Sequence, residues 1–252
     1  HDSVGRLTGV TDPLGRVTRT EYDPYERRTA TIDAAGRSTT YTYDVLGRVV
    51  ALTDPAGNVT QTAYDALGNV LRRMDANGHA TITAYDSLNR PISITDANGN
   101  VITNVYDAAG NLVSVTNGLG ITTVYAYDAL NRRVAETDPL GNTKQYEFDA
   151  LDNLISETDA NGVVTHYEYD ALKRVIAVVR NYRPGVQPDA HTNVRVSYAY
   201  DAAGNRIAVT DANGHSTRFE YDNLNRLIQK TDPLNHSWLF AFDAVGNRVS
   251  VT

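Results

Sequence analysis

The sequence predicts an all-β fold: a repeat array of 21-residue β-hairpin units that form a continuous antiparallel ribbon, wound into a spiral, shell-like β-solenoid. Three observations predict it: an aromatic–Asp pair that returns every 21 residues, two turn motifs in each period, and short segments between the turns. A unit of this length cannot bury a core alone, so neighbouring units must stabilise one another. We therefore expect one array over residues 1–252.

The aromatic–Asp pair sets the period. It recurs every 21 residues from Tyr22-Asp23 to Tyr169-Asp170, and after one interval of 31 residues it resumes at Tyr200-Asp201. With His1-Asp2 in register, twelve units start at residues 1, 22, 43, 64, 85, 106, 127, 148, 169, 200, 221 and 242. The chain opens without Met and its last unit is incomplete, so we expect a piece of a longer protein.

Each unit contains two turn motifs about ten residues apart. In the unit that begins at Tyr43 they are Asp44-Val-Leu-Gly47, the first turn, and Asp54-Pro-Ala-Gly57, the second turn. Asp followed three residues later by Gly predicts a type I turn closed by a left-handed residue, with the Asp side chain accepting backbone N–H groups. Nearly all residues at the fourth position are Gly, Asn or Asp, which tolerate positive φ; Glu26 and Lys173 are the exceptions.

The segments between the turns are too short for helices and are predicted to be strands. The first carries an apolar residue at its third position, such as Val50, and the second often reads Thr-x-Tyr-x-Tyr, as at Thr123, Tyr125 and Tyr127. Residues two apart share one sheet face, where aromatic residues pair well across strands. About 23 strands are expected, and because open sheets rarely exceed about ten without curling, the ribbon must bend.

A row of apolar residues lies at the third position of the first turn, where solvent exposure is expected. Its members are Val4, Tyr25, Leu46, Leu67, Leu88, Ala109, Leu130, Leu151, Leu172, Ala203, Leu224 and Val245. Apolar residues gathered along one edge indicate a contact surface. We expect this edge to pack on the next winding of the ribbon or on protein outside this sequence.

Composition excludes several function classes. The net charge of −7 arises mainly from turn Asp residues, and no basic stripe of the kind that binds nucleic acid is present. There is no Cys, and thus no disulfide or thiolate metal site. No apolar run is long enough to span a membrane, and we expect no signal peptide directly before the first repeat.

Three chemical alternatives are weaker than a structural interpretation. Rows of Asp suggest paired catalytic carboxylates, but equivalent residues lie two strands, or about 10 Å, apart. Turns such as Asp96 to Asn100 resemble a calcium loop without its bidentate Glu. His79, His215 and His236 share one position after the second turn, where surface substitution is favoured over metal binding. We expect no catalytic, metal or cofactor site and no enzymatic activity; a binding site is left unassigned.

The recurring YDxLGR and TDPxGN motifs resemble the Rhs or YD-repeat family over essentially the whole chain. The resemblance implies a hairpin ribbon wound into a hollow shell, as in bacterial Rhs effectors, cocoon components of insecticidal toxin complexes and teneurin-like barrels. It implies a secreted or cell-surface parent protein whose passenger or plug domain, a toxin in bacterial members, is the partner of the array.

The alternative is an extracellular adhesion module that binds glycans or a cell-surface partner through its tyrosine-rich face. The segment near residues 179–190 replaces one second turn with a longer Pro/Gly loop, for which tolerated insertion is favoured over a functional contact. The interior face, the pitch and closure of the winding and the oligomeric state are left open.

Overall fold

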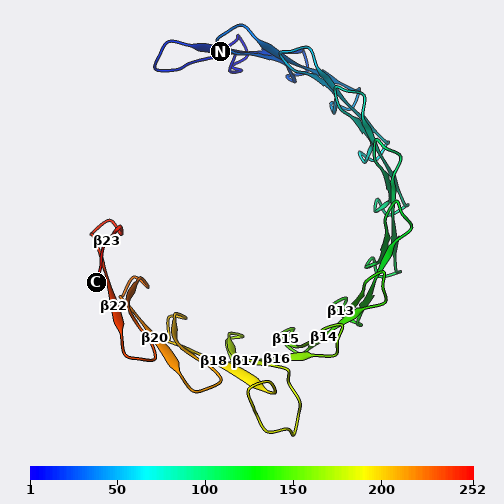
Figure 1. Ribbon diagram of the computed structural model, residues 1–252. Coiled ribbons are helices and arrows are strands. Elements are labelled where there is room, and N and C mark those ends of the chain that lie inside the picture. The colour runs from blue at the N-terminus through cyan, green and yellow to red at the C-terminus, as the bar shows by residue number, and fades with distance from the viewer. The chain divides into compact units, whose positions relative to one another are not determined.

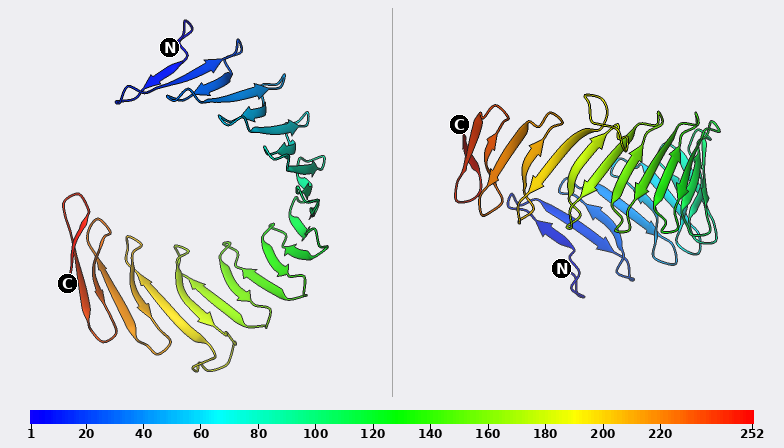
Figure 2. Two further views of the ribbon diagram at one scale, coloured as in Figure 1. Left: turned by 45° about the horizontal axis from the view of Figure 1, so that its top comes forward. Right: turned by 90° about the horizontal axis from the view of Figure 1, so that it is seen from below.

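The computed structural model describes residues 1–252, and every regular element in it is a β-strand. The residues group into two compact units, His1–Thr122 and Thr123–Thr252. Within each unit the strands follow one another in chain order as a curved antiparallel ribbon one sheet thick (Figure 1, Figure 2). No helix is long and apolar enough to cross a membrane. The predicted all-β fold class of antiparallel hairpin repeats is confirmed.

In the first unit, short strands of three to six residues alternate with tight turns. The strands are β1 (Gly9–Thr11), β2 (Val17–Tyr22), β3 (Arg28–Ile32), β4 (Ser38–Tyr43), β5 (Val49–Thr53), β6 (Val59–Tyr64), β7 (Val70–Met74), β8 (Ala80–Tyr85), β9 (Pro91–Thr95), β10 (Val101–Tyr106) and β11 (Leu112–Thr116).

The second unit continues the same alternation, interrupted by one longer loop between β17 and β18. Its strands are β12 (Thr122–Tyr127), β13 (Arg133–Thr137), β14 (Thr143–Phe148), β15 (Leu154–Thr158), β16 (Val164–Tyr169), β17 (Val175–Arg180), β18 (Val194–Tyr200), β19 (Arg206–Thr210), β20 (Ser216–Tyr221), β21 (Leu227–Thr231), β22 (Ser237–Phe242) and β23 (Arg248–Val251).

Both turns of the repeat have the predicted geometry. In the first turn, the Gly47 N–H donates to the Asp44 carbonyl oxygen at 3.0 Å, the Asp44 N–H donates to the Arg48 carbonyl oxygen at 3.0 Å, and Gly47 has a φ of 81°. Glu26 and Lys173, which depart from the residue rule, adopt the same left-handed conformation with φ values of 66° and 61°. The hydrogen-bonded turn therefore dictates the backbone even where the side chain disfavours it.

Every hairpin closed by a first turn contains a β-bulge, whereas second-turn hairpins such as β5–β6 and β7–β8 pair without a shift in register. Between β4 and β5, Thr42 pairs with Ala51 and Tyr43 pairs with Val49, so Val50 has no partner. The periodic apolar residue that the sequence shows at the third strand position is thus the bulge residue. A bulge bends its strand and increases the local twist, and one bulge per 21 residues accounts for the regular curvature of each ribbon.

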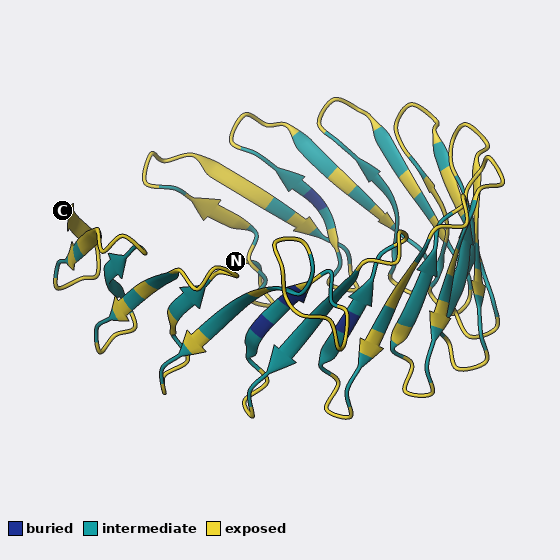
Figure 3. Cartoon of the chain, turned by 60° about the horizontal axis from the view of Figure 1, so that its bottom comes forward, coloured by how far each residue is buried: buried dark blue, intermediate teal, exposed yellow.

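The ribbon has almost no enclosed core, because no second layer covers either face. Figure 3 shows most residues as intermediate or exposed, and only Ala30, Ser156, Ala177 and Val179 are buried. Ala177, fully buried, lies opposite Glu168 on β16 and Ser197 on β18, so longer side chains of neighbouring strands cover it. Stability in such an array comes from contacts between adjacent strands and not from a shared interior.

The longer loop comprises residues 181–193 in the structure, a few residues later than expected. Val179 and Arg180 extend β17, because they pair with Arg195 and Val194 of β18. The additional pairs lengthen this hairpin relative to its neighbours, and the loop projects beyond the adjacent turns (Figure 2).

Candidate functional site

The repeated first turn is the most highly organised polar feature of the chain. Asp44 Oδ1 accepts the N–H groups of Leu46 at 2.9 Å and Arg48 at 3.0 Å, while Asp44 Oδ2 accepts from Arg48 Nε at 2.7 Å. The backbone N–H of Arg48, together with its guanidinium, holds the pKa of the Asp44 carboxyl below its usual value of 3.8. The carboxylate is thus fully used in closing the turn.

Arg48 also reaches the next repeat. Its Nη1 donates to the Asp65 carbonyl oxygen at 2.7 Å, and the guanidinium lies over the Tyr64 ring, 4.6 Å from the ring centre. One side chain therefore joins the turn of its own repeat to the aromatic–Asp pair of the following repeat. We call this three-way contact the inter-repeat clamp.

The clamp recurs wherever Arg stands four residues after the Asp of a first turn. The arginines are Arg6, Arg27, Arg48, Arg90, Arg132, Arg174 and Arg226, and the aromatic residues beneath them are Tyr22, Tyr43, Tyr64, Tyr106, Phe148, Tyr200 and Phe242. Elsewhere Asn takes this position, and Asn69 and Asn205 donate to the side chains of Asn89 and Asn225. The clamp was not predicted from the sequence, although a regular alternation of Arg and Asn from residue 48 onward marks its position.

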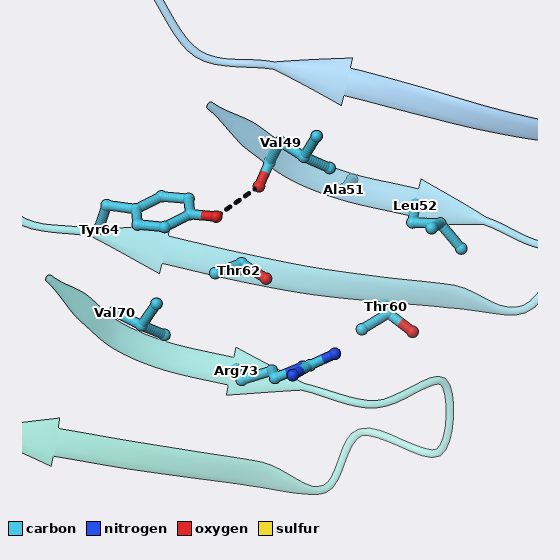
Figure 4. Close-up of a pocket in the computed structure, with 8 residues that line it drawn as sticks. All are labelled: Val49, Ala51, Leu52, Thr60, Thr62, Tyr64, Val70 and Arg73. Atoms are coloured by element: carbon cyan, nitrogen blue, oxygen red, sulfur yellow. Dashed lines mark hydrogen bonds between the residues drawn. The ribbon is translucent and has the colours of Figure 1, made fainter. Parts of the chain in front are cut away.

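The tyrosines of the aromatic–Asp pairs are held by the sheet itself. Figure 4 shows the Tyr64 hydroxyl directed at the Val49 carbonyl oxygen, to which it donates at 3.1 Å. The surrounding depression has a volume of about 440 Å³ and is lined by apolar and Thr side chains with Arg73 as its one charged group. Equivalent hydroxyl-to-carbonyl bonds recur in other repeats. These rings link strands, and their hydroxyl groups already have partners.

A second aromatic position lies two residues earlier on the same face, which we call the tyrosine face. In the second unit this position is aromatic in every repeat, and we call the set the aromatic row: Tyr125, Tyr146, Tyr167, Tyr198, Phe219 and Phe240. In the first unit only Tyr41 is aromatic at this position. All six members of the aromatic row are half-buried. Burial and the nearby Glu157 carboxylate raise the pKa of Tyr167 above its usual value.

Comparison with known proteins agrees with this geometry. The family model described as RHS Repeat matches residues 1–37, 27–59, 64–101, 106–143, 148–182, 189–215 and 200–235, which together span most of the chain. The chain belongs to the RHS repeat family. No curated protein matches the RHS repeat chain by sequence.

The fold of this RHS array is similar to solved structures named TcdB2-TccC3. The first has a TM-score of 0.52 at 18% sequence identity, with 100% of this chain and 18% of that chain covered. Two further crystal structures, TcdB2-TccC3-TEV and TcdB2-TccC3-Cdc42, each give a TM-score of 0.51 at the same identity and coverage. The RHS array thus spans about a fifth of the length of these chains.

The polar residues that suggested a metal or catalytic site have turn partners. His79 Nδ1 lies 3.1 Å from Asp75 Oδ2, and His215 and His236 make the same contact with their own second-turn Asp, at the position that Arg16 and Arg37 occupy in other repeats. Asp96 accepts the N–H groups of Asn98 and Asn100 and the Asn100 side chain. No group of three or more His, Asp or Glu residues is positioned to hold a metal ion.

The apolar edge formed by the first turns is exposed in both units. Leu67 is 74% exposed, and Leu46, Leu88, Leu130, Leu151, Leu172 and Leu224 are comparably open. The second-turn edge also carries exposed leucines, at Leu14, Leu119, Leu140 and Leu234, but Asn occupies the same position at residues 77, 98, 161 and 213. The first-turn edge is therefore the more continuous apolar surface, and the sequence-based hypothesis that it packs on other protein remains a prediction.

Proposed function

We propose that this RHS array is a segment of the wall of a shell that encloses or displays a passenger domain within a larger parent protein. The passenger is a toxin domain by resemblance to the bacterial members of the family, and the parent is secreted or exposed at the cell surface. The array contributes structure and no enzymatic activity of its own. Family membership and the similarity of fold to one segment of much longer chains support this proposal.

The observation that carries the proposal is a single-layered ribbon with both faces and one apolar edge incompletely covered. Of 252 residues only four are buried, far fewer than in a domain that folds around its own core. A wall gains further burial from the windings beside it and the contents behind it. The sheet thus has the properties of a component whose partners lie elsewhere in the parent chain.

Small-angle scattering and electron microscopy of the purified chain, and of the parent protein, test this proposal. A curved wall or hollow particle, whose pair-distance distribution lacks intensity at the centre, is expected. A narrow solid rod would contradict a shell and favour a stalk.

An adhesion module that binds glycans through the tyrosine face is the second candidate. The aromatic row favours it, because half-buried aromatic rings on an uncovered sheet face are suited to stacking against sugars. Binding to a glycan panel that is saturable and lost in Tyr146→Ala or Tyr167→Ala would support adhesion. If no glycan of the panel binds at the tyrosine face, the result would favour a role as shell wall over adhesion.

A further inference from the structure

The loop at residues 181–193 has a defined conformation that is held by hydrogen bonds from two asparagine side chains. The Asn193 side chain accepts the Arg183 N–H at 2.7 Å and donates to the carbonyl oxygens of Arg183 at 3.0 Å and Val186 at 2.7 Å. The Asn181 side chain donates to the His191 carbonyl oxygen at 2.7 Å. Both asparagines adopt positive φ, and their side chains hold the two ends of the loop together. A merely tolerated insertion does not require such a network.

The loop and the neighbouring strands line an open pocket of about 760 Å³. Apolar groups line one part of it, among them Val179, which is 5% exposed, and Val194. Tyr182 contributes an aromatic wall, and its ring stacks on His166 with the ring centres 4.6 Å apart. The volume falls in the range of sites for small ligands, which combine an apolar surface with a few fixed polar groups.

The polar groups of the pocket are of both charge signs. Glu168 and Arg195, on β16 and β18, form a two-pronged ion pair across β17, with one contact at 2.8 Å between Arg195 Nη2 and Glu168 Oε2. Asp189 contributes a second carboxylate, of which Oδ1 accepts the N–H groups of His191 and Thr192. Asn213, from the neighbouring second turn, adds an amide.

This combination selects among ligand classes. Glu168 and Arg195 already neutralise each other, and Asp189 Oδ1 accepts two loop N–H groups, so the pocket presents little uncompensated charge to a ligand with a net charge of either sign. A hydroxyl group both donates and accepts hydrogen bonds, and it can pair with carboxylates, guanidinium and amide together. The aromatic ring of Tyr182 complements the apolar C–H face of a pyranose.

We propose that the pocket formed by residues 181–193 and strands β16 to β18 binds a neutral carbohydrate. The site is separate from the tyrosine face. Glu168 and Arg195 share a sheet face with Ala177, whereas Tyr167 pairs with Val178 on the opposite face. It is also independent of the shell function, since a wall segment can carry a ligand site on either face.

The test is binding of the full chain to neutral and charged oligosaccharides on a glycan panel, followed by titration of the neutral oligosaccharides by ligand-observed NMR. Tyr182→Ala is expected to weaken binding about tenfold or more, as loss of an aromatic wall does. Asp189→Asn keeps the oxygen that accepts the loop amides and is expected to weaken binding less. Tyr25→Ala, an exposed tyrosine of the first-turn edge that does not line the pocket, serves as the matched control and should leave the Kd unchanged, while Tyr146→Ala tests the tyrosine face separately.

A loop exchange distinguishes the loss of the binding site from misfolding of the chain. Residues 181–193 are replaced by the five-residue turn Asp159 to Val163 of the preceding repeat, which closes the same kind of hairpin. The exchanged chain should keep its circular dichroism spectrum and lose carbohydrate binding. Absence of any neutral carbohydrate ligand, a preference for charged sugars, or equal binding by the parent chain and the loop exchange would overturn the proposal. Loss of binding in Tyr146→Ala alone would instead place the ligand on the tyrosine face.

Discussion

Arg48 and Tyr64 belong to adjacent repeats, and the guanidinium of Arg48 lies 4.6 Å from the centre of the Tyr64 ring. The same guanidinium binds the Asp44 carboxylate of its own turn and the Asp65 carbonyl oxygen of the following repeat. In a repeat array, stability is the sum of the stabilities of the repeats and of the interfaces between neighbours. The clamp is a defined part of the interface term, because one side chain contacts both repeats.

Loss of one clamp should therefore destabilise the array. Arg48→Ala removes a cation–π contact and charged hydrogen bonds, and we expect it to lower the free energy of unfolding by about 2 kcal/mol. Arg37→Ala is the matched control, since Arg37 makes only the ion pair with its own turn Asp and is 69% exposed, so about 0–1 kcal/mol is expected. Urea unfolding followed by circular dichroism measures both changes. Equal effects would mean that the clamp does not couple repeats.

The sequence was sufficient to predict the strands and turns because their determinants are local. Asp, Pro and Gly specify the turn geometry within four residues, and the two-residue spacing of Thr and Tyr specifies a face of the sheet. Even the exceptions followed the backbone rule, since Glu26 and Lys173 take positive φ as the turn requires.

The clamp, the bulge and the loop pocket depend on contacts between segments distant in the sequence. Val50 is apolar and β-branched like many strand residues, and only the pairing of Tyr43 with Val49 identifies it as the bulge residue. Arg48 meets Tyr64 because β5 and β6, which separate the two residues in the sequence, pair antiparallel and bring the start of β5 beside the end of β6. The pocket requires Glu168 and Arg195, 27 residues apart, to meet across β17. No local pattern encodes these distances.

Glu26 offers a test of the turn geometry in the stabilising direction. Its φ is 66° and its side chain makes no hydrogen bond or ion pair, so Glu26→Gly removes left-handed strain without removing a contact. We expect the free energy of unfolding to rise by about 0.5–1 kcal/mol. Thermal and urea unfolding measure this change, and destabilisation by Glu26→Gly would contradict the left-handed conformation assigned to Glu26.

The converse change is Gly57→Ala. The added Cβ would have no neighbour within 4 Å, and because the φ of Gly57 is 86° we expect the free energy of unfolding to fall by about 1 kcal/mol from the backbone alone.

The turn carboxylates predict a loss of stability in acid. Hydrogen bonds from the Arg48 backbone N–H to Asp44, and from the Asn58 side chain to Asp54, lower the pKa of these groups, and most other turn Asp residues are affected in the same way. Because the folded-state pKa lies below the unfolded value of about 3.9, the stabilisation is complete above that pH and is lost as the pH falls through the folded-state pKa. Melting temperatures should be nearly constant from pH 8 to 5 and should decline steeply below pH 4.

Asn117 provides the control for this pH dependence. It occupies the place of the second-turn Asp, and its Oδ1 accepts the N–H groups of Leu119 at 3.0 Å and Ile121 at 3.1 Å without a titrating group. Asp54→Asn should accordingly keep the turn and reduce the number of protons taken up on acid unfolding by about one. A decline that begins near pH 6 would point to histidine and away from the turn carboxylates.

The apolar edge supplies the last prediction, which addresses the proposed function directly. Leu67, Leu88 and Leu130 are each at least 66% exposed, so in this chain their replacement by Ser removes little buried area and should leave the melting temperature nearly unchanged. In the parent protein the same triple substitution should loosen or dissociate the windings, at a cost of about 1.5–3 kcal/mol for each leucine that the contact buries. Leu14, Leu140 and Leu234, exposed on the second-turn edge, give a matched triple control expected to have the smaller effect. Melting and size-exclusion chromatography of the parent protein distinguish the two edges; identical behaviour of the first-turn variant and the unmodified parent would show that this edge contacts nothing.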